Sequence, residues 1–436
     1  MINIPKDLSD IEVGIYKSGY SYCESLVKVK HMAIAKAVEN TAERYGALKM
    51  ISDMDCFQEF LFREVTAYTE PSIGVSDPSL SDKNWWNELK HTPSFKPEYW
   101  SRYYDYLLRK PSWSIAAVED INSSTDEIMN SLTNPRKGMA GERMGMVFGY
   151  VQSGKTAHYI GMINKAYDAG YRIVIVLSGI HNSLRSQTQS RIDEEVLGYE
   201  TSLESIGDMT RERNAIGVGI GPYNQVETPV QSITTRDEKG DVNKKTEGVS
   251  MMPPLMVVTK KNASVLRKIL RFFRKNYCAE IIGGKKKIPA KYPALIIDDE
   301  ADQASINTRA SYDDILDDYN PTTINGLIRE LLNIFECRSY VGYTATPFAN
   351  IFIPPHIDDE RYGTDLFPRD FIYRAPRADQ YIGAREFFGL GGEDIPAMPL
   401  YRKITDGAGY LGKGTKSTDA VGELPKELKL AGEYFF

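Results

Sequence analysis

Two short stretches of the sequence carry side chains suited to the chemistry of a nucleotide. The first, GYVQSGKT at 149–156, fits the pattern G-x-x-x-x-G-K-[ST] of a phosphate-binding loop. Its glycines let the backbone turn so that successive N–H groups converge on an anion, and the following helix adds the partial positive charge of its N-terminus. We expect Lys155 to reach the β and γ phosphates and the Thr156 hydroxyl to bind Mg²⁺. The predicted cofactor-binding residues are Gly149, Gln152, Ser153, Gly154, Lys155 and Thr156.

The second stretch is the acidic segment ALIIDDEAD at 294–302, in which an apolar run typical of a buried strand ends in carboxylates. We predict that Asp299 holds Mg²⁺, directly or through water, and that Glu300 polarises the water that attacks the γ-phosphate. Asp298 is the neighbouring alternative, and the alternation along the strand favours Asp299. A solvated acidic turn is the other interpretation of this stretch taken alone. The predicted catalytic residues are Glu300, Lys155 and Asp299.

A third segment, TATP at 344–347, ends a later apolar strand. The order of the three segments resembles the first RecA-like domain of superfamily 2 helicases and translocases. In that superfamily the corresponding segment links the nucleotide site to the nucleic-acid site, so the resemblance implies a coupling role for Thr344 and Thr346. A threonine hydroxyl can also hydrogen-bond the acidic segment from a neighbouring strand, which an apolar side chain cannot do.

The residues around these motifs resemble the Z1 domain family more closely. The similar segments are GYVQSGKTAHYIGMINKAYDAG, VVTKKNASVL, LIIDDEADQASINT and YVGYTATPFANIFI, and the resemblance covers residues 95–436. Members are bacterial P-loop proteins, often labelled endonucleases, that accompany DNA methyltransferases and nuclease-like proteins in restriction-like anti-phage defence. The resemblance implies ATP and Mg²⁺ as cofactors and those proteins as partners. It does not supply a demonstrated reaction.

Contacts with nucleic acid are predicted in segments that follow two of the strands. Loops at the strand ends of a translocase lobe normally touch the nucleic-acid backbone, and cations there make salt-sensitive phosphate contacts. The candidates are Arg185, Gln187, Lys260, Lys261 and Asn262. Helix capping and local ion pairs are the alternative roles, and the sequence does not separate the two. We expect the lysine run at 283–291 to be a solvated loop, with a groove as the alternative, and the aromatic residues at 99–113 to be helix core, with a platform for base stacking as the alternative.

The function predicted from these motifs is that of an ATP-hydrolysing helicase-like or translocase-like module acting on nucleic acid, most simply DNA. No arginine-bearing motif of a second RecA-like lobe follows Thr346, and a helix has just begun when the chain ends, so we expect a truncated second lobe. A nucleotide-dependent switch or scaffold that recruits effector proteins is one alternative. A Mg²⁺-dependent DNA endonuclease is another, although no convincing D…[DE]-x-K pattern is present.

The elements that must position these residues follow from apolar periodicity. Residues 1–140 have mostly helical spacing, and from 145 onward short apolar strands alternate with helices. That alternation predicts an α/β fold with a mostly parallel sheet, here a RecA-like P-loop NTPase domain at 141–355 with a polar insertion or mobile loop at about 200–252. Residues 356–436 are expected to be a linker and the start of the second lobe.

Composition sets the remaining bounds. The 436 residues carry a formal net charge of −6, which argues against coating nucleic acid through bulk charge but leaves room for a local basic groove. No apolar run approaches the roughly 20 residues of a membrane-spanning helix, and no export signal is visible, so we expect a cytoplasmic protein without membrane contact. The four cysteines lie far apart and are expected to be reduced.

Overall fold

The computed structural model describes most of the first 378 residues. The described residues are 8–28, 30, 32, 34–47, 49, 51–66, 69–70, 73–79, 82–110, 113–149, 154–203, 214–222, 224–242, 253–278, 280–282, 285–306, 322–355, 358–359, 362–378, 426 and 429. Contacts divide the chain into two compact units, residues 1–379 and 380–436. The elements labelled α1 to α11 and β1 to β14 belong to the first unit.

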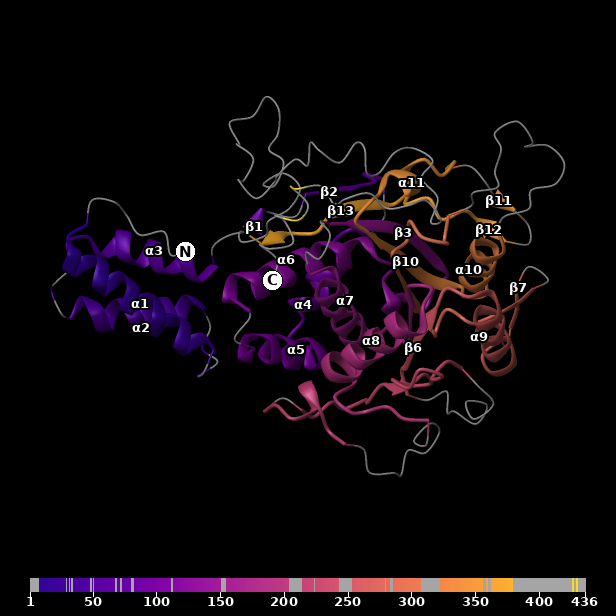
Figure 1. Cartoon of the computed structure of the whole chain (residues 1–436), viewed down its shortest axis with the longest axis horizontal. Coiled ribbons are helices and arrows are strands. Elements are labelled where there is room, and N and C mark those ends of the chain that lie inside the picture. Colours follow the sequence, from indigo (N-terminus) through magenta and orange to yellow (C-terminus); the bar gives the residue numbers. More distant parts are fainter. Residues whose placement is uncertain are drawn as a thin grey trace. The chain divides into compact units, whose positions relative to one another are not determined.

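An eight-stranded, mostly parallel sheet forms the centre of the first unit (Figure 1). Its spatial order is β2 (Ile73–Ser76), β13 (Phe371–Arg374), β3 (Gly141–Phe148), β10 (Cys337–Thr344), β9 (Ala294–Asp299), β4 (Ile173–Ser178), β6 (Leu255–Lys260) and β5 (Gln231–Ser232). The pair β2 and β13 is antiparallel, and the other neighbouring strands run parallel. The mixed α/β class with a mostly parallel sheet, expected from the sequence, is therefore confirmed.

Helices cover both faces of the sheet, which is why its central strands are apolar along their whole length. Along β4, Val174 and Val176 belong to the core beneath α7 (Lys155–Ala169), whereas Ile173 and Ile175 belong to the core beneath α9 and α10. On the first face α7 packs against α5 (Glu98–Arg109) and α6 (Ile115–Ser131). The helices α4 (Trp85–Lys90) and α6 are also in contact.

The second face carries α9 (Ala263–Asn276) and α10 (Thr323–Asn333), which pack on each other. Asn262 caps α9, because its side-chain oxygen accepts the backbone N–H of Ser264 at 3.0 Å. The buried side of α9 consists of Val265, Leu266, Ile269, Leu270, Phe272 and Phe273. The opposite side carries exposed cations, so α9 is strongly amphipathic.

The sheet extends beyond the boundaries that the sequence suggested. The strand β2 lies within residues 1–140, where we expected helices, and β13 lies within residues 356–436, yet β13 pairs with β3 and β2 pairs with β13. The domain boundaries expected near residues 140 and 355 therefore do not coincide with the first and last residues that contribute to the sheet. Part of the predicted insertion also belongs to the sheet, because β5 pairs with β6, and Ile233 and Thr234 beside it are fully buried.

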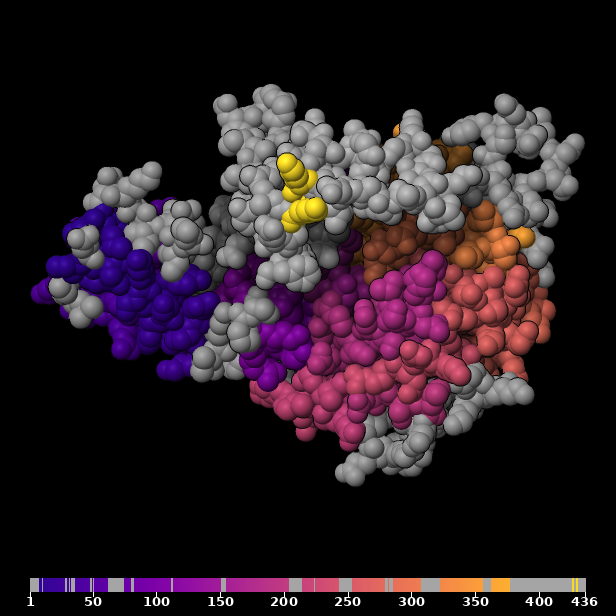
Figure 2. Space-filling model, viewed as in Figure 1, coloured from indigo at the N-terminus to yellow at the C-terminus, as the bar shows by residue number. Residues whose placement is uncertain are grey.

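The remaining elements are short or lie toward the N-terminus. The helices α1 (Asp10–Lys28), α2 (Ile34–Gly46) and α3 (Met54–Thr66) pack on one another and make up the indigo group of atoms in Figure 2. The other short elements are α8 (Asn182–Ile192), α11 (Phe348–Ile351), β1 (Thr69–Glu70) with β14 (Arg377–Ala378), β7 (Glu280–Ile282) with β8 (Lys285–Lys287), and β11 (Asp358–Asp359) with β12 (Gly363–Thr364). Among the described residues, no helix is both long and apolar enough to cross a membrane.

Candidate nucleotide-binding site

The three predicted motifs meet at one edge of the sheet. The strands β3, β10 and β9 are parallel neighbours, so the segments that follow them leave from the same, carboxyl edge. Thr344 pairs with Phe148, and Tyr343 pairs with Asp299, so the three strands end level with one another. The backbone N–H of Gly149 also donates to the carbonyl oxygen of Thr344 at 3.1 Å. This bond joins the start of the phosphate-binding sequence to the TATP segment.

The predicted phosphate-binding sequence connects β3 to the N-terminus of α7. Gly154 is the residue before the helix and has a φ of 90°, a left-handed conformation that strains any residue with a Cβ. Lys155 is the first residue of α7, and Lys155 and Thr156 are both partly buried. Gln152 and Ser153 lie outside the described residues. The described part of the motif has the strand, glycine and helix that a phosphate-binding loop requires.

The two neighbouring aspartates of the acidic segment lie in different surroundings. Asp298 is fully buried, with its Oδ1 2.9 Å from the Lys261 ammonium, and its Oδ2 accepts the Tyr340 hydroxyl at 2.7 Å. These two contacts occupy the Asp298 carboxylate within the core. Asp299 is the last residue of β9 and is partly buried at the carboxyl end of that strand. Its position favours Asp299 over Asp298 as a ligand for a cation.

A tyrosine of α7 lies beside the two predicted Mg²⁺ ligands. The Tyr159 hydroxyl donates to Asp299 Oδ2 at 3.3 Å, and the Thr156 side chain lies near enough to act on the pKa of Tyr159. Burial, and then the charge of Glu300, raises the pKa of Asp299 to about 6. A bound cation would offset both effects, because it favours the ionised carboxylate. The side-chain oxygens of Thr156 and Asp299 thus lie near the same tyrosine hydroxyl. Hard oxygen ligands of this kind are those that Mg²⁺ prefers.

Glu300 sits in a strained turn directly after β9. Its φ of 57° lies in the left-handed region, which is uncommon for a residue other than glycine. The Glu300 carbonyl accepts from the Lys261 ammonium at 2.5 Å and from the Gln303 N–H at 2.9 Å, and the next N–H, of Ala301, donates to Tyr343 at 2.9 Å. These bonds hold the backbone in place while the Glu300 side chain remains partly exposed at the edge. Strain of this kind at a polar edge is typical of functional positions.

The TATP segment is bonded to the end of the acidic segment. Thr344 Oγ1 donates to Asp302 Oδ1 at 2.8 Å, and Thr346 Oγ1 donates to Asp302 Oδ2 at 2.6 Å. Both predicted coupling residues therefore donate hydrogen bonds to the carboxylate of Asp302, which lies three residues after Asp299 in the chain. Thr344 is fully buried and Thr346 is exposed, so the pair spans from the core to the surface. The hydroxyl contact between the two segments has the form that the sequence led us to expect.

The residues predicted to contact nucleic acid differ in where the structure places them. Arg185 is fully buried, and its guanidinium donates to the carbonyl oxygens of Thr235 and Asp237. Lys261 is 1% exposed and bonded to the acidic segment. Neither side chain can reach a ligand at the surface from its buried position. The expectation that Arg185 and Lys261 contact nucleic acid is therefore corrected.

The other three candidates lie closer to the surface. Lys260 is partly buried and bonds to the Asn182 side chain, and Asn262 caps α9. Gln187 is exposed on α8. Lys260 and Asn262 thus have the local roles that the sequence left open as the alternative, namely pairing for Lys260 and helix capping for Asn262. The aromatic segment is core as expected, since Tyr99, Trp100 and Tyr103 are all buried.

Sequence reasoning missed three contributors to the site. Tyr159 follows Thr156 by three residues, a helical spacing that places both on one side of α7 and could have signalled their contact. Asp302 was visible as the last letter of the acidic segment, but its two threonine donors depend on the pairing of strands. Lys261 was predicted for a different role, and its contact with Asp298 could not have been found from spacing, because the two residues are 37 apart in the sequence.

A scan against models of protein families and a search of curated proteins both returned no match to this chain. What the structure defines is a mixed α/β protein whose mostly parallel sheet gathers a glycine turn, an acidic turn and a hydroxyl-bearing turn at its carboxyl edge.

Proposed function

We propose that this chain binds ATP with Mg²⁺ at the carboxyl edge of β3, β10 and β9, and hydrolyses it. The observation that carries the proposal is the Tyr159 hydroxyl, which comes from the helix that begins with Lys155 and Thr156 and bonds to Asp299 of the acidic segment far away in the sequence. The strand β10 lies between β3 and β9, so the two motifs are separated by about 10 Å across the sheet. Terminal phosphates and a hydrated cation can span that separation.

Each residue has a distinct role in this proposal. Lys155 and the first N–H groups of α7 bind the β and γ phosphates, and Gly154 allows the backbone to approach them. Thr156 and Asp299 hold the cation, whose chemistry when bound is to neutralise charge on the phosphate oxygens. Glu300 accepts a proton from the attacking water and orients it.

The protein acts, in this proposal, as a RecA-like module of the superfamily 2 type on nucleic acid. Support comes from the sequence resemblance to helicases and to the Z1 domain family, and from the bonding of Thr344 and Thr346 to Asp302. That bonding gives the nucleotide site a direct link to an exposed segment. The proposed setting is bacterial anti-phage defence in the cytoplasm, with DNA as the nucleic acid and methyltransferase or nuclease-like proteins as partners.

Substitution of the lysine and the glutamate tests the nucleotide site. Lys155→Ala should weaken the binding of ATP with Mg²⁺, measured by isothermal titration calorimetry, by at least about 10-fold, because a charge-assisted hydrogen bond to phosphate is lost. Lys239→Ala, at an exposed lysine in another part of the chain, is the matched control and should leave the affinity unchanged. Glu300→Gln should keep the affinity while slowing hydrolysis by about 100-fold.

Two outcomes would contradict the proposal or narrow it. Unchanged ATP affinity in Lys155→Ala would remove the site assignment. Turnover that DNA of any form fails to raise would remove the translocase interpretation and favour the nucleotide-dependent switch. DNA cutting that persists in Glu300→Gln would instead favour the endonuclease.

A further inference from the structure

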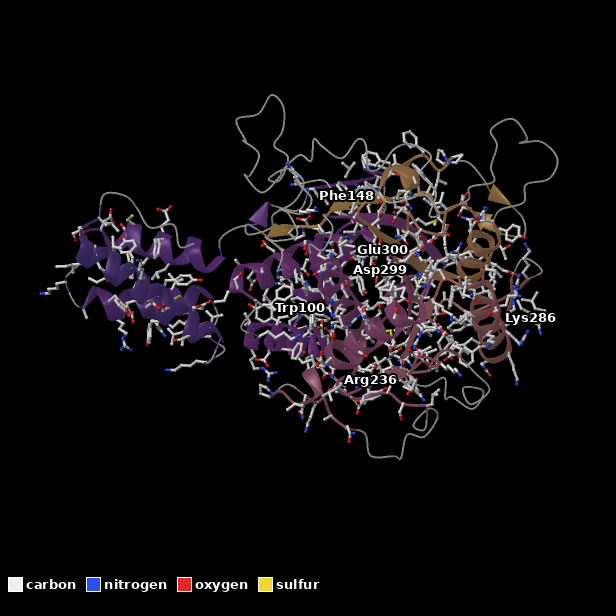
Figure 3. The ribbon with its side chains drawn as sticks, in the orientation of Figure 1. Trp100, Phe148, Arg236, Lys286, Asp299 and Glu300 are labelled. Carbon is white, nitrogen blue, oxygen red and sulfur yellow. The ribbon has the colours of Figure 1, made fainter. Side chains whose placement is uncertain are left out.

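A basic groove lies on the flank of the sheet, between α9, α10 and the β7–β8 hairpin. Its volume is about 800 Å³, and its lining includes Arg267, Arg271, Arg274 and Lys275 of α9 together with Lys286 of β8. Figure 3 places Lys286 well away from Asp299 and Glu300, so the groove is separate from the nucleotide site. A second hollow of about 540 Å³ shares Arg274 and Lys286 and adds Lys285 and Lys287.

The charge of this groove is one-sided. Among its described lining residues, five cations face one carboxylate, Glu330 of α10, which pairs with Arg274 at 2.7 Å. Arg267, Arg271 and Lys286 are all exposed. The chain as a whole carries a net charge of −6, so the groove contrasts in sign with the protein around it. Such a concentration of one charge attracts anions and guides their approach.

The basic residues of the groove come from two separate segments of the sequence. Packing of the core does not require either segment to be basic. Arg267, Arg271 and Arg274 follow one another at intervals of four and three residues, so they share the outer side of α9. Like charges at this spacing disfavour the helix by a few tenths of a kcal/mol per pair. The lysine run, expected to be a solvated loop, instead forms β8 and adds Lys286 to the same surface.

We propose that this groove binds the phosphate backbone of nucleic acid. Arginines four residues apart on α9 are separated by about 6 Å along the helix axis. Each guanidinium can donate two parallel hydrogen bonds to one phosphate. The lining contains one described aromatic residue, Tyr362, so it offers no series of rings on which successive bases could stack. Binding is therefore to the backbone and independent of base sequence.

An acidic segment of a partner protein is the competing occupant, and the lining favours phosphate over it. The described apolar side chains of the groove are the two leucines Leu270 and Leu327, both buried, so a peptide would find few anchors for its own apolar residues. The inference deepens the proposed function by giving the nucleic acid a surface. The inference rests on the proposed function only for the biological role of the groove, because binding of DNA to the groove does not require a bound nucleotide.

Charge reversal in the full chain tests the groove. The double variant Arg267→Glu, Arg271→Glu should bind a fluorescent duplex DNA, followed by anisotropy without nucleotide, at least about 10-fold more weakly than the unmodified protein. The slope of log affinity against log salt concentration should fall by about 2, one for each lost phosphate contact. The control Lys83→Glu, Lys239→Glu makes the same change in net charge at exposed sites elsewhere and should change the affinity less than 2-fold.

The outcomes separate this inference from the nucleotide proposal. The groove variant should keep its ATP affinity and its thermal midpoint, and Lys155→Ala should keep its affinity for DNA. Equal loss in the groove variant and the control would show that only net charge matters and would overturn the inference. Unchanged DNA binding would overturn it as well, and loss of polyglutamate binding with DNA binding retained would assign the groove to an acidic protein segment instead.

Discussion

One hydroxyl, that of Tyr159, defines the geometry of the proposed cation site. It donates to Asp299 at 3.3 Å, lies one helical turn from Thr156 on α7, and its own ring is buried against Tyr343. Burial, followed by the charge of Asp299, raises the pKa of Tyr159 well above its usual value, so the hydroxyl keeps its proton at physiological pH. A permanent donor in this place fixes the orientation of the carboxylate before any ligand arrives.

Tyr159→Phe removes that donor and leaves the ring in the core. We expect the affinity for Mg²⁺ in the presence of a saturating nucleotide to fall by about 10-fold, because supporting hydrogen bonds orient metal ligands. Affinity for the nucleotide without Mg²⁺ should be retained, since Lys155 and Gly154 are untouched. Calorimetric titrations with and without Mg²⁺ measure both quantities. An equal loss in the two titrations would show that the hydroxyl only supports the fold of α7.

The choice between Asp298 and Asp299 shows what the sequence could and could not predict. The position of the three segments at the ends of parallel strands was predictable, because each segment follows a local apolar run, and the structure brings the three strand ends together at one edge. The partners of Asp298 were not, because Lys261 and Tyr340 reach it only after the strands have paired. Arg185 illustrates the same limit, since its burial depends on a segment about 50 residues away.

The connection between β6 and α9 is fastened to the end of β9 by Lys261. Its ammonium contacts Asp298 Oδ1 at 2.9 Å and the carbonyl oxygens of Asp299 and Glu300 at 2.8 and 2.5 Å. All these groups are buried or partly buried, so loss of the ammonium would leave the Asp298 charge without a counter-ion, although Tyr340 would still donate to Asp298 and Gln303 to the Glu300 carbonyl. A buried pair of this kind specifies the arrangement of the two strand ends more than it adds net stability.

Lys261→Met should therefore destabilise the protein strongly. Removing one partner of a buried ion pair leaves the Asp298 charge uncompensated, and the expected loss in the free energy of unfolding is about 3–5 kcal/mol. Lys260→Met changes the adjacent lysine, which is 18% exposed at its side chain, and should cost less than about 1 kcal/mol. Urea denaturation followed by circular dichroism measures both variants. Similar losses in the two would contradict the assigned role of Lys261.

Strands and helices were predictable to different degrees. The strands β4, β6 and β9 each form an apolar run between polar turns, which marks a strand buried on both faces. The edge strand β2 and its neighbour β13 are only four residues long and carry no such run, so the region around β2 was expected to be helical. Their place in the sheet comes from pairing with β3 and with each other, a long-range effect that local periodicity does not encode.

The nucleotide site and the basic groove are connected through the turn that follows β9. On one side Lys261 binds this turn and directly precedes Asn262, the cap of α9. On the other side Asn325 of α10 donates to the Ser305 carbonyl at 2.8 Å and to Asp365 at 3.1 Å. Residues 298–305, which contain the proposed catalytic carboxylates, are thus bonded directly to α10 through Asn325 and to Lys261, two residues before α9 begins. A contiguous network of this kind can carry coupling between two sites.

If both proposals hold, ATP and DNA should alter each other's affinity, and Asn325→Ala should reduce that effect. The coupling is the ratio of DNA affinities measured with and without ATP·Mg²⁺, and a lost contact along the network should lower it by about 3-fold or more. The same factor must appear in ATP affinities measured with and without DNA, because coupling between binding sites is reciprocal. Gln189→Ala removes a buried amide on α8, whose bonds to Asp193 and Thr234 lie outside the network, and should leave the ratio intact. A ratio unchanged in Asn325→Ala, with both affinities retained, would show that α10 does not transmit the nucleotide state to the groove.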